Sequence, residues 1–216
     1  MNIILFGPPG AGKGTQSENI VKTFNLFKIS TGDLLRSEIK KKTNLGKKIK
    51  PLIDNGLFVS DDIINDLISK ILSDKKYSNR IIFDGYPRNL SQAKRLTSLL
   101  DNFNVKISCV LNLQADKETI IKRITGRQIC SKCKLIFNEY FHPANKENHN
   151  CDSKYLIKRT DDNEKTIANR FDDYIEKTLP ILDFYRELNL LREINGMSNM
   201  NEIFKEIRDI IASLEG

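Results

Sequence analysis

The chain has 216 residues, a formal net charge of +7 at pH 7, and 39% hydrophobic and 29% charged residues. This length suits one globular fold with insertions, and the balance of apolar and charged residues excludes a disordered or fibrous chain. No apolar stretch is long enough to span a bilayer and no cleavable signal pattern opens the chain, so we expect a cytoplasmic protein. The basic charge favours a polyanionic partner, but it does not distinguish a nucleotide from a nucleic acid or an anionic membrane.

Short apolar runs alternate with longer segments of helical spacing. We expect strands at 3–6, 26–29, 80–83, 107–113 and 190–195. Residues 60–74 place six apolar side chains on one helical face behind a Ser60 cap: Ile63, Ile64, Leu67, Ile68, Ile71 and Leu72. The alternation predicts an α/β fold, with a parallel sheet between helices and ligands at the carboxyl ends of the strands.

The first predicted strand runs into the phosphate-binding loop GPPGAGKGT. Its glycines let backbone amides turn toward an anion, and Lys13 reaches the terminal phosphates. Gly14 stands where such loops usually carry a hydroxyl that ligates magnesium. The metal must then be held mostly by nucleotide oxygens and water, oriented by a nearby acid. Asp84, at the end of the third strand, is the candidate; the alternative for Asp84 is a turn or cap residue.

Arginines gather beside the predicted strand ends and loops: Arg36, Arg88, Arg123, Arg127, Arg159 and Arg170. Together they predict a basic cavity for several phosphates. Moving a phosphoryl group between two nucleotides brings two polyanions together, and bidentate guanidinium groups offset the repulsion. A phosphate acceptor with a second pKa near ~6 is largely ionised at neutral pH and needs no general base.

Residues 122–159 break the alternation, being rich in Asn, Lys, Cys and His without a long helical stripe, and we expect a small β-rich insertion. Beyond it, Asp161 and Glu164 resemble a capping pair for a helix that Pro180 divides or kinks. Asp161 and Asp162 are also candidates for holding the arginines. Cys109 lies in the fourth predicted strand and is expected to be a buried, unreactive thiol.

Five segments, in order and at matching spacing, resemble the adenylate kinase family in its long-lid bacterial type: GPPGAGKGTQ, STGDLLR, DGYPRN, RITGR, and RTDD with a later NRF. The resemblance runs from residue 1 to about 200. It implies reversible, Mg²⁺-dependent transfer of the γ-phosphoryl group of ATP to AMP, giving two ADP. It also implies a P-loop three-layer fold with a central parallel five-stranded sheet, and a monomer that binds neither nucleic acid nor membrane. The P-loop core would comprise 1–29, 60–121 and 160–216, with a helical AMP-binding segment at 30–59 and a lid at 122–159.

The resemblance also implies site residues. ATP would be bound by Gly10, Ala11, Gly12, Lys13, Gly14, Thr15, Arg123, Arg127, Ile136, Phe137 and Ser198. AMP would be bound by Thr31, Arg36, Leu57, Phe58, Val59, Gly85, Tyr86, Pro87, Arg88, Gln92, Arg159 and Arg170. Transfer would depend on Lys13, Arg88, Arg123, Arg159 and Arg170, with Asp84 at the magnesium water shell. The Thr31 hydroxyl and the Gln92 amide can both hydrogen-bond an adenine edge, which favours AMP as acceptor.

Relatives of this type often hold structural zinc in the lid through CxxC and a later CxxC or CxxD. Cys130, Cys133 and Cys151 supply three such ligands, but Lys154 occupies the fourth position. His149 or Asp152 offers an acceptable donor, although each lies close to Cys151 for the usual knuckle geometry. The alternative is a metal-free lid that depends on packing of Phe137, Tyr140 and Phe141.

Three other functions stay open at this point. A kinase for another nucleoside monophosphate would share the fold and mechanism. A zinc-ribbon nucleic-acid binder would leave the phosphate loop unexplained and lacks interleaved aromatic residues. A switch GTPase would need a guanine motif and the magnesium hydroxyl that Gly14 removes.

Overall fold

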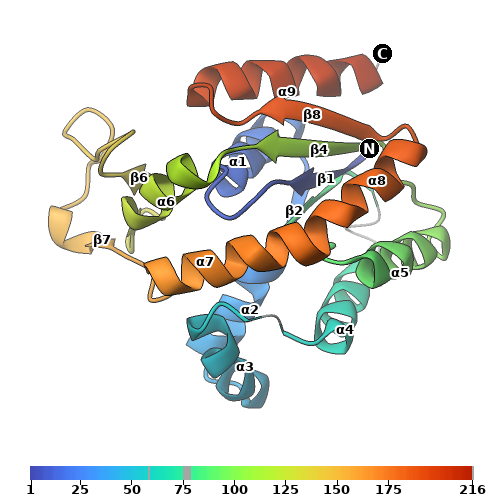
Figure 1. Cartoon of the computed structure of the whole chain (residues 1–216), viewed down its shortest axis with the longest axis horizontal. Helices are drawn as coiled ribbons and strands as arrows, with labels where there is room; N and C mark the ends of the chain where they lie inside the picture. The colour runs from blue at the N-terminus through green and yellow to red at the C-terminus, as the bar shows by residue number, and fades with distance from the viewer. Residues whose placement is uncertain (58, 75–78, 216) are drawn as a thin grey trace.

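A computed structural model describes residues 1–57, 59–74 and 79–215. Its centre is a five-stranded parallel sheet in the order β2-β3-β1-β4-β8 (Figure 1). The strands are β1 (Asn2–Phe6), β2 (Phe27–Ser30), β3 (Ile81–Asp84), β4 (Cys109–Gln114) and β8 (Leu191–Asn195). Every one of the five predicted strands is present, and the predicted three-layer α/β class is confirmed.

Helices cover both faces of this sheet. On one face, α1 (Lys13–Phe24) and α9 (Met200–Glu215) bury Ile20 and Ile207 against Leu5 and Ile82. On the other face lie α4 (Asp61–Leu72), α5 (Leu90–Asp101) and α8 (Leu179–Glu187), which share a core with Ile4 and Phe83. Successive residues of a strand point to opposite faces of the sheet. Because β1, β3 and β4 are apolar at most positions, each of them contributes side chains to both cores.

Two short helices form the predicted acceptor-side segment beside β2. They are α2 (Thr31–Lys40) and α3 (Asn44–Asp54), and they pack against each other. Ser30 and Thr43 cap them through hydrogen bonds from the backbone N–H groups of Asp33 and Gly46. A Cβ at Gly46 would overlap the carbonyl oxygen of Glu38, so this close packing of α3 on α2 requires glycine.

The expected β-rich insertion is also present. After α6 (Lys117–Thr125) come β5 (Arg127–Cys130), β6 (Ile136–Asn138) and β7 (Leu156–Ile157), with a 3₁₀ turn at Ser153–Tyr155. They form an antiparallel sheet in the order β6-β5-β7. The first residues of the predicted lid therefore belong to a helix.

The chain returns from the insertion along α7 (Glu164–Asp173), which continues through a π turn at Tyr174–Thr178 into α8. The prediction that Asp161 caps this helix is wrong. Asn163 is the cap, since its side chain accepts a hydrogen bond from the Thr166 N–H, while Asp161 pairs with Arg170. Pro180 lies just after the π turn, near the start of α8. Because proline has no backbone N–H to donate to the preceding turn, the regular α-helical hydrogen bonding is interrupted here, as the sequence predicted.

Among the described residues, no helix combines the length and the apolar character needed to cross a bilayer.

Candidate functional site

A cavity of about 1140 Å³ opens at the carboxyl ends of β1, β2 and β3. Its wall includes the phosphate loop, α2, the loop after β3, and the lid strands. Pockets for one drug-sized ligand measure about 300–1000 Å³. This cavity therefore has room for more than one small nucleotide-sized molecule.

The phosphate loop adopts the conformation that its glycines predict. Gly10 and Gly12 have φ of +82° and +93°, and Gly12 is the N-cap of α1. A Cβ at Gly10 would lie 2.8 Å from Cγ1 of Ile124, so the close approach of α6 also requires glycine there. The amino end of α1 thus faces the cavity and favours an anion.

Lys13 lies folded against its own loop. Its ammonium donates to the carbonyl oxygens of Gly7 (2.6 Å) and Pro8 (2.9 Å). Burial lowers the pKa of Lys13 to about 8, and the charge of Asp84 only partly opposes this effect. The Lys13 ammonium is therefore a poorly solvated cation, and a negatively charged phosphate oxygen would be a better partner for it than the two carbonyl oxygens.

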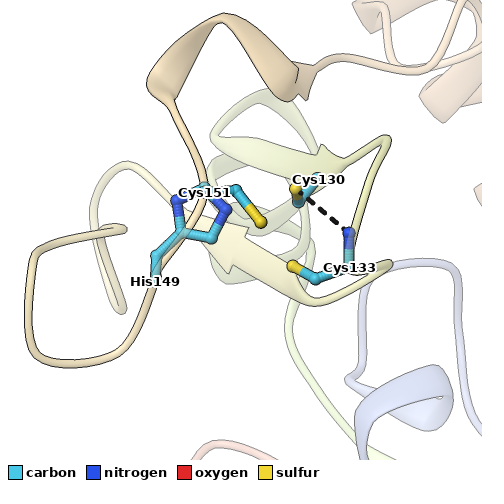
Figure 2. A group of neighbouring side chains, drawn as sticks. All are labelled: Cys130, Cys133, His149 and Cys151. Carbon is cyan, nitrogen blue, oxygen red and sulfur yellow. Dashed lines mark hydrogen bonds between the residues drawn. The ribbon is translucent and has the colours of Figure 1, made fainter.

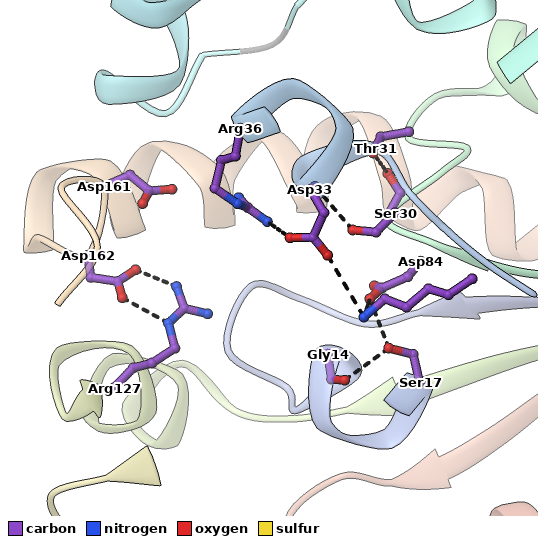
Figure 3. A network of polar contacts seen from close by, with 12 residues as sticks. Gly14, Ser17, Ser30, Thr31, Asp33, Arg36, Asp84, Arg127, Asp161 and Asp162 are labelled. Atoms are coloured by element: carbon purple, nitrogen blue, oxygen red, sulfur yellow. Dashed lines mark hydrogen bonds and ion pairs between the residues drawn. The ribbon is translucent and has the colours of Figure 1, made fainter. Parts of the chain in front are cut away.

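One turn after Gly14, the hydroxyl of Ser17 lies near Asp84 (Figure 3). The Ser17 hydroxyl lies 3.0 Å from the Gly14 carbonyl oxygen and 3.1 Å from Oδ2 of the buried Asp84. A side chain at position 14 would meet only Ile136, at 3.9 Å, so packing does not demand glycine. The loop lacks a metal-ligating hydroxyl at position 14 and has a buried carboxylate nearby instead.

Three of the predicted arginines pair with carboxylates at the cavity wall. Figure 3 shows Arg127 forked onto Asp162 and Arg36 facing Asp33, with an Arg36–Asp33 distance of 2.7 Å. Arg170 pairs with Asp161. Burial alone would raise the pKa of Asp161, but the charge and hydrogen bond of Arg170, together with the charges of Arg36 and Arg159, hold that pKa below its usual range.

Arg88 and Arg159 lie where a positive charge is unfavourable in the empty protein. Burial, followed by repulsion from Arg170 and Arg36, lowers the pKa of Arg88 to about 10. Burial, followed by repulsion from Arg127 and Arg36, does the same for Arg159. Cations crowded in a half-buried wall form a site that a polyanion would stabilise.

The predicted acceptor-base residues lie at the edge of the cavity rather than in its wall. Thr31 donates its hydroxyl proton to the Gly85 carbonyl oxygen at 2.9 Å. The Gln92 amide accepts from the Arg88 N–H at 2.7 Å and donates to Asp61 Oδ1 at 2.6 Å. Both groups are thus engaged within the protein, and Gln92 would have to turn to reach a base.

Most of the residues that the sequence predicted as site residues do line the cavity: Gly10 to Thr15, Arg36, Asp84, Gly85, Pro87, Arg88, Arg123, Arg127, Ile136, Phe137, Arg159, Arg170 and Ser198. Among the described residues, Thr31, Leu57, Val59, Tyr86 and Gln92 do not. Phe58 lies outside the described residues.

Among the residues in the wall that sequence reasoning did not predict are Lys28 and Phe141. Phe141 stacks near the Arg123 guanidinium, 5.7 Å from ring centre to Cζ. For Lys28 a signal existed, because the strand alternation puts it on the same side as Ser30, at the end of β2.

The lid carries a separate cluster of possible metal ligands (Figure 2). One donor atom from each of Cys130, Cys133, His149 and Cys151 lies within 4.8 Å of the others. His149 Nε2 is buried and has no hydrogen-bond partner among the described residues. Three sulfurs and one imidazole at this spacing match a tetrahedral zinc site.

His149 rather than Asp152 is the fourth member of this cluster. The Asp152 carboxylate instead accepts from the Lys154 N–H and lies 3.6 Å from the Lys154 ammonium. Although His149 and Cys151 are only two residues apart, the loop before β7 lets both side chains converge on the cluster. Burial opposes ionisation of Cys130, but hydrogen bonds, led by the Cys133 N–H, lower the pKa of Cys130 to about 6.

The sheet order, the phosphate loop and the arginine-lined cavity define a P-loop nucleotide-binding α/β protein. The family model of adenylate kinase matches residues 5–190. An adenylate kinase of Pelagibacter ubique (strain HTCC1062) is 49% identical over 211 residues, covering 98% of this chain and 99% of the relative. Those of Listeria innocua (39%) and Bacillus cytotoxicus (41%) cover 99% of this chain and their own whole length. The chain belongs to the adenylate kinase family and is a phosphotransferase.

Proposed function

We propose that this chain transfers the γ-phosphoryl group of ATP to AMP, reversibly, and so interconverts ATP plus AMP with two ADP. The observation that supports this most directly is that one cavity is lined both by the phosphate loop and by a second set of arginines. A site for one nucleotide and water would not need Arg36 and Arg88 opposite Lys13.

The donor side is the loop from Gly10 to Thr15. Its N–H groups and the start of α1 bind the ATP phosphates, and Lys13 exchanges its carbonyl partners for phosphate oxygens. Arg123 and Arg127 bind the same phosphates from the lid side, with Ile136 and Phe137 near the base and Ser198 at its far edge.

The acceptor side binds AMP. Arg36 and Arg88 bind its phosphate, together with Arg159 and Arg170, which close on the transferring group. The base and ribose would be bound by Thr31, Gln92, Leu57, Val59 and the chain at 85–87; Thr31, Gln92, Leu57, Val59 and Tyr86 lie outside the cavity wall and would have to approach AMP on closure. Because the acceptor oxygen is already ionised, no general base is required, and positioning with charge stabilisation carries the reaction.

Magnesium fits this site. The buried Asp84 carboxylate, with Ser17 beside it, would hold the water shell of the ion. When bound, Mg²⁺ would neutralise part of the phosphate charge. The loop itself offers no hydroxyl at position 14.

Domain motion completes the proposal. Residues 30–59 and 122–159 would close over AMP and ATP on a core made of 1–29, 60–121 and 160–216. Closure would exclude water, which otherwise competes as acceptor. The ion pairs of Arg36, Arg127 and Arg170 with aspartates would have to rearrange at this step.

We also propose structural zinc in the lid, held by Cys130, Cys133, Cys151 and His149. The unpartnered, buried Nε2 of His149 supports this, since an imidazole nitrogen buried without a partner is costly unless it binds an ion. A metal there would fix the loop from 139 to 155, which carries little regular structure.

The acceptor is tested by mixing the protein with ATP, Mg²⁺ and one nucleoside monophosphate at a time, and following diphosphates by phosphorus NMR. Rapid ADP formation with AMP alone is expected. Faster turnover with UMP, CMP or GMP would keep the mechanism and overturn the roles of Thr31 and Gln92. Loss of ATP without an acceptor would indicate an ATPase. A cytoplasmic monomer stays a prediction, which gel filtration and cell fractionation would test.

A further inference from the structure

A lysine on β2 reaches into the nucleotide cavity. Lys28 pairs in register with Ile82, and Ser30 pairs with Asp84. Paired residues in neighbouring strands share a face, so the Lys28 side chain lies on the same side of the sheet as Asp84. That side chain is only 19% exposed, and lysine is seldom buried to this extent unless it is paired.

The Lys28 ammonium lies between two carboxylates. It is 3.4 Å from Asp84 Oδ2 and 3.9 Å from Asp33 Oδ2. Asp84 also accepts from Ser17 on α1, and Asp33 pairs with Arg36 on α2. The result is a row of polar groups from the phosphate-loop helix to α2, of which Figure 3 labels Ser17, Asp84, Asp33 and Arg36.

The two ends of this row serve different substrates. Asp84 lies where the magnesium of ATP would be oriented, and Arg36 lies where the AMP phosphate would bind. A cation between them has two effects by Coulomb's law. It neutralises Asp33, which weakens the hold of Asp33 on Arg36. It also repels a second cation from Asp84.

We propose that Lys28 is a positioning residue that couples the two nucleotide sites, by freeing Arg36 for the acceptor phosphate and by competing with magnesium for Asp84. The proposal rests on the proposed function, since it takes the roles of Arg36 and Asp84 from it. It predicts effects of opposite sign at the two sites, which local damage to the cavity would not produce.

The test measures binding without turnover, by calorimetry. AMP is titrated alone, and ATP is titrated with and without Mg²⁺ in the absence of AMP. In Lys28→Gln the AMP Kd should rise by about fivefold, the upper end of what one partly exposed ion pair contributes. The ratio of the ATP Kd without Mg²⁺ to that with Mg²⁺ should rise as well, because Lys28 no longer competes with the magnesium ion for Asp84.

Three variants accompany this one. Lys28→Arg keeps the charge and should restore both quantities toward those of the unmodified protein. Lys28→Met keeps the alkyl packing and gives the same readouts should Lys28→Gln not fold. Lys22→Gln removes an equal charge from an exposed position on α1 and should change neither quantity.

The outcomes separate the two proposals. Failure of the unmodified protein to bind AMP would overturn the proposed function. Normal AMP binding by the unmodified protein would leave that function standing. In that case, an unchanged AMP Kd in Lys28→Gln, or a magnesium ratio that stays the same or falls, would overturn the role of Lys28 alone.

Discussion

Arg88 should matter for catalysis while contributing little to the stability of the empty protein. Burial and the neighbouring Arg170 and Arg36 lower its pKa from 12.5 to about 10. At about 1.4 kcal/mol for each pKa unit, this placement of the guanidinium is unfavourable by roughly 3 kcal/mol before its remaining contacts are counted. Those contacts include a hydrogen bond from Nε to the Gly85 carbonyl oxygen at 2.8 Å.

Replacing Arg88 by Met removes the charge and keeps most of the alkyl chain. The free energy of unfolding of the empty protein should stay the same or increase. Turnover should fall by about 10³-fold or more, as when an arginine that stabilises a transferring phosphoryl group is lost. The charge that is unfavourable in the empty site is the one that two bound polyanions stabilise.

The assay compares kcat for ADP formation with urea unfolding monitored by circular dichroism. Arg95→Met, an exposed arginine on α5, is the matched control and should change neither quantity. A loss of less than about tenfold in kcat, corresponding to about 1.4 kcal/mol, would remove Arg88 from the reacting centre. The loss in kcat can be converted to an activation free energy. A decrease of the same size in the free energy of unfolding would show that Arg88 stabilises the fold instead.

Three further predictions concern the lid, the loop lysine and an ion pair. His149→Ser should release lid zinc and lower the melting temperature, whereas the control His142→Ser should keep the metal. Atomic absorption measures the zinc content and calorimetry the melting temperature. Metal retained by His149→Ser would point to another ligand. The kcat/KM for ATP should fall as pH rises through about 8, because the free protein then loses the proton of Lys13, whereas kcat should persist to higher pH because bound phosphate stabilises the ammonium. A flat kcat/KM profile between pH 7 and 9 would show that the Lys13 charge is not needed for binding. Asp162→Asn should lower the Kd for ATP measured without AMP, because Arg127 is no longer held by a carboxylate; weaker ATP binding would mean that Asp162 orients Arg127 instead of competing with ATP for it.

Local patterns predicted the scaffold well. The strand ends follow from apolar runs, and the amphipathic pattern of 60–74 became α4. Ser60 holds the N-cap position, although its side chain makes no capping hydrogen bond. The glycines of the phosphate loop follow from the backbone conformation that such a loop requires. In each case the deciding interactions lie within a few residues, or along one face of an element, so the order and spacing of residues in the sequence already encode them.

Contacts between distant segments were harder to predict. The capping role of Asp161 was wrong, because a charge partner on the next helix and a better cap at Asn163 outweighed the local pattern. The pairing of Arg127 with Asp162 joins residues 35 positions apart. The engagement of Gln92 by Asp61 joins two helices that meet only in the folded chain.

The sequence by itself determined the sheet, the phosphate loop, the absence of a hydroxyl at position 14 and the supply of arginines, since these depend on residue type and short spacing. Only the tertiary structure decided that His149 completes the lid cluster and that Lys28 stands between Asp33 and Asp84. The lid cluster and the contacts of Lys28 both depend on where separate loops and strands place their side chains. That placement follows from packing of the whole sheet and lid, which no short stretch of sequence encodes.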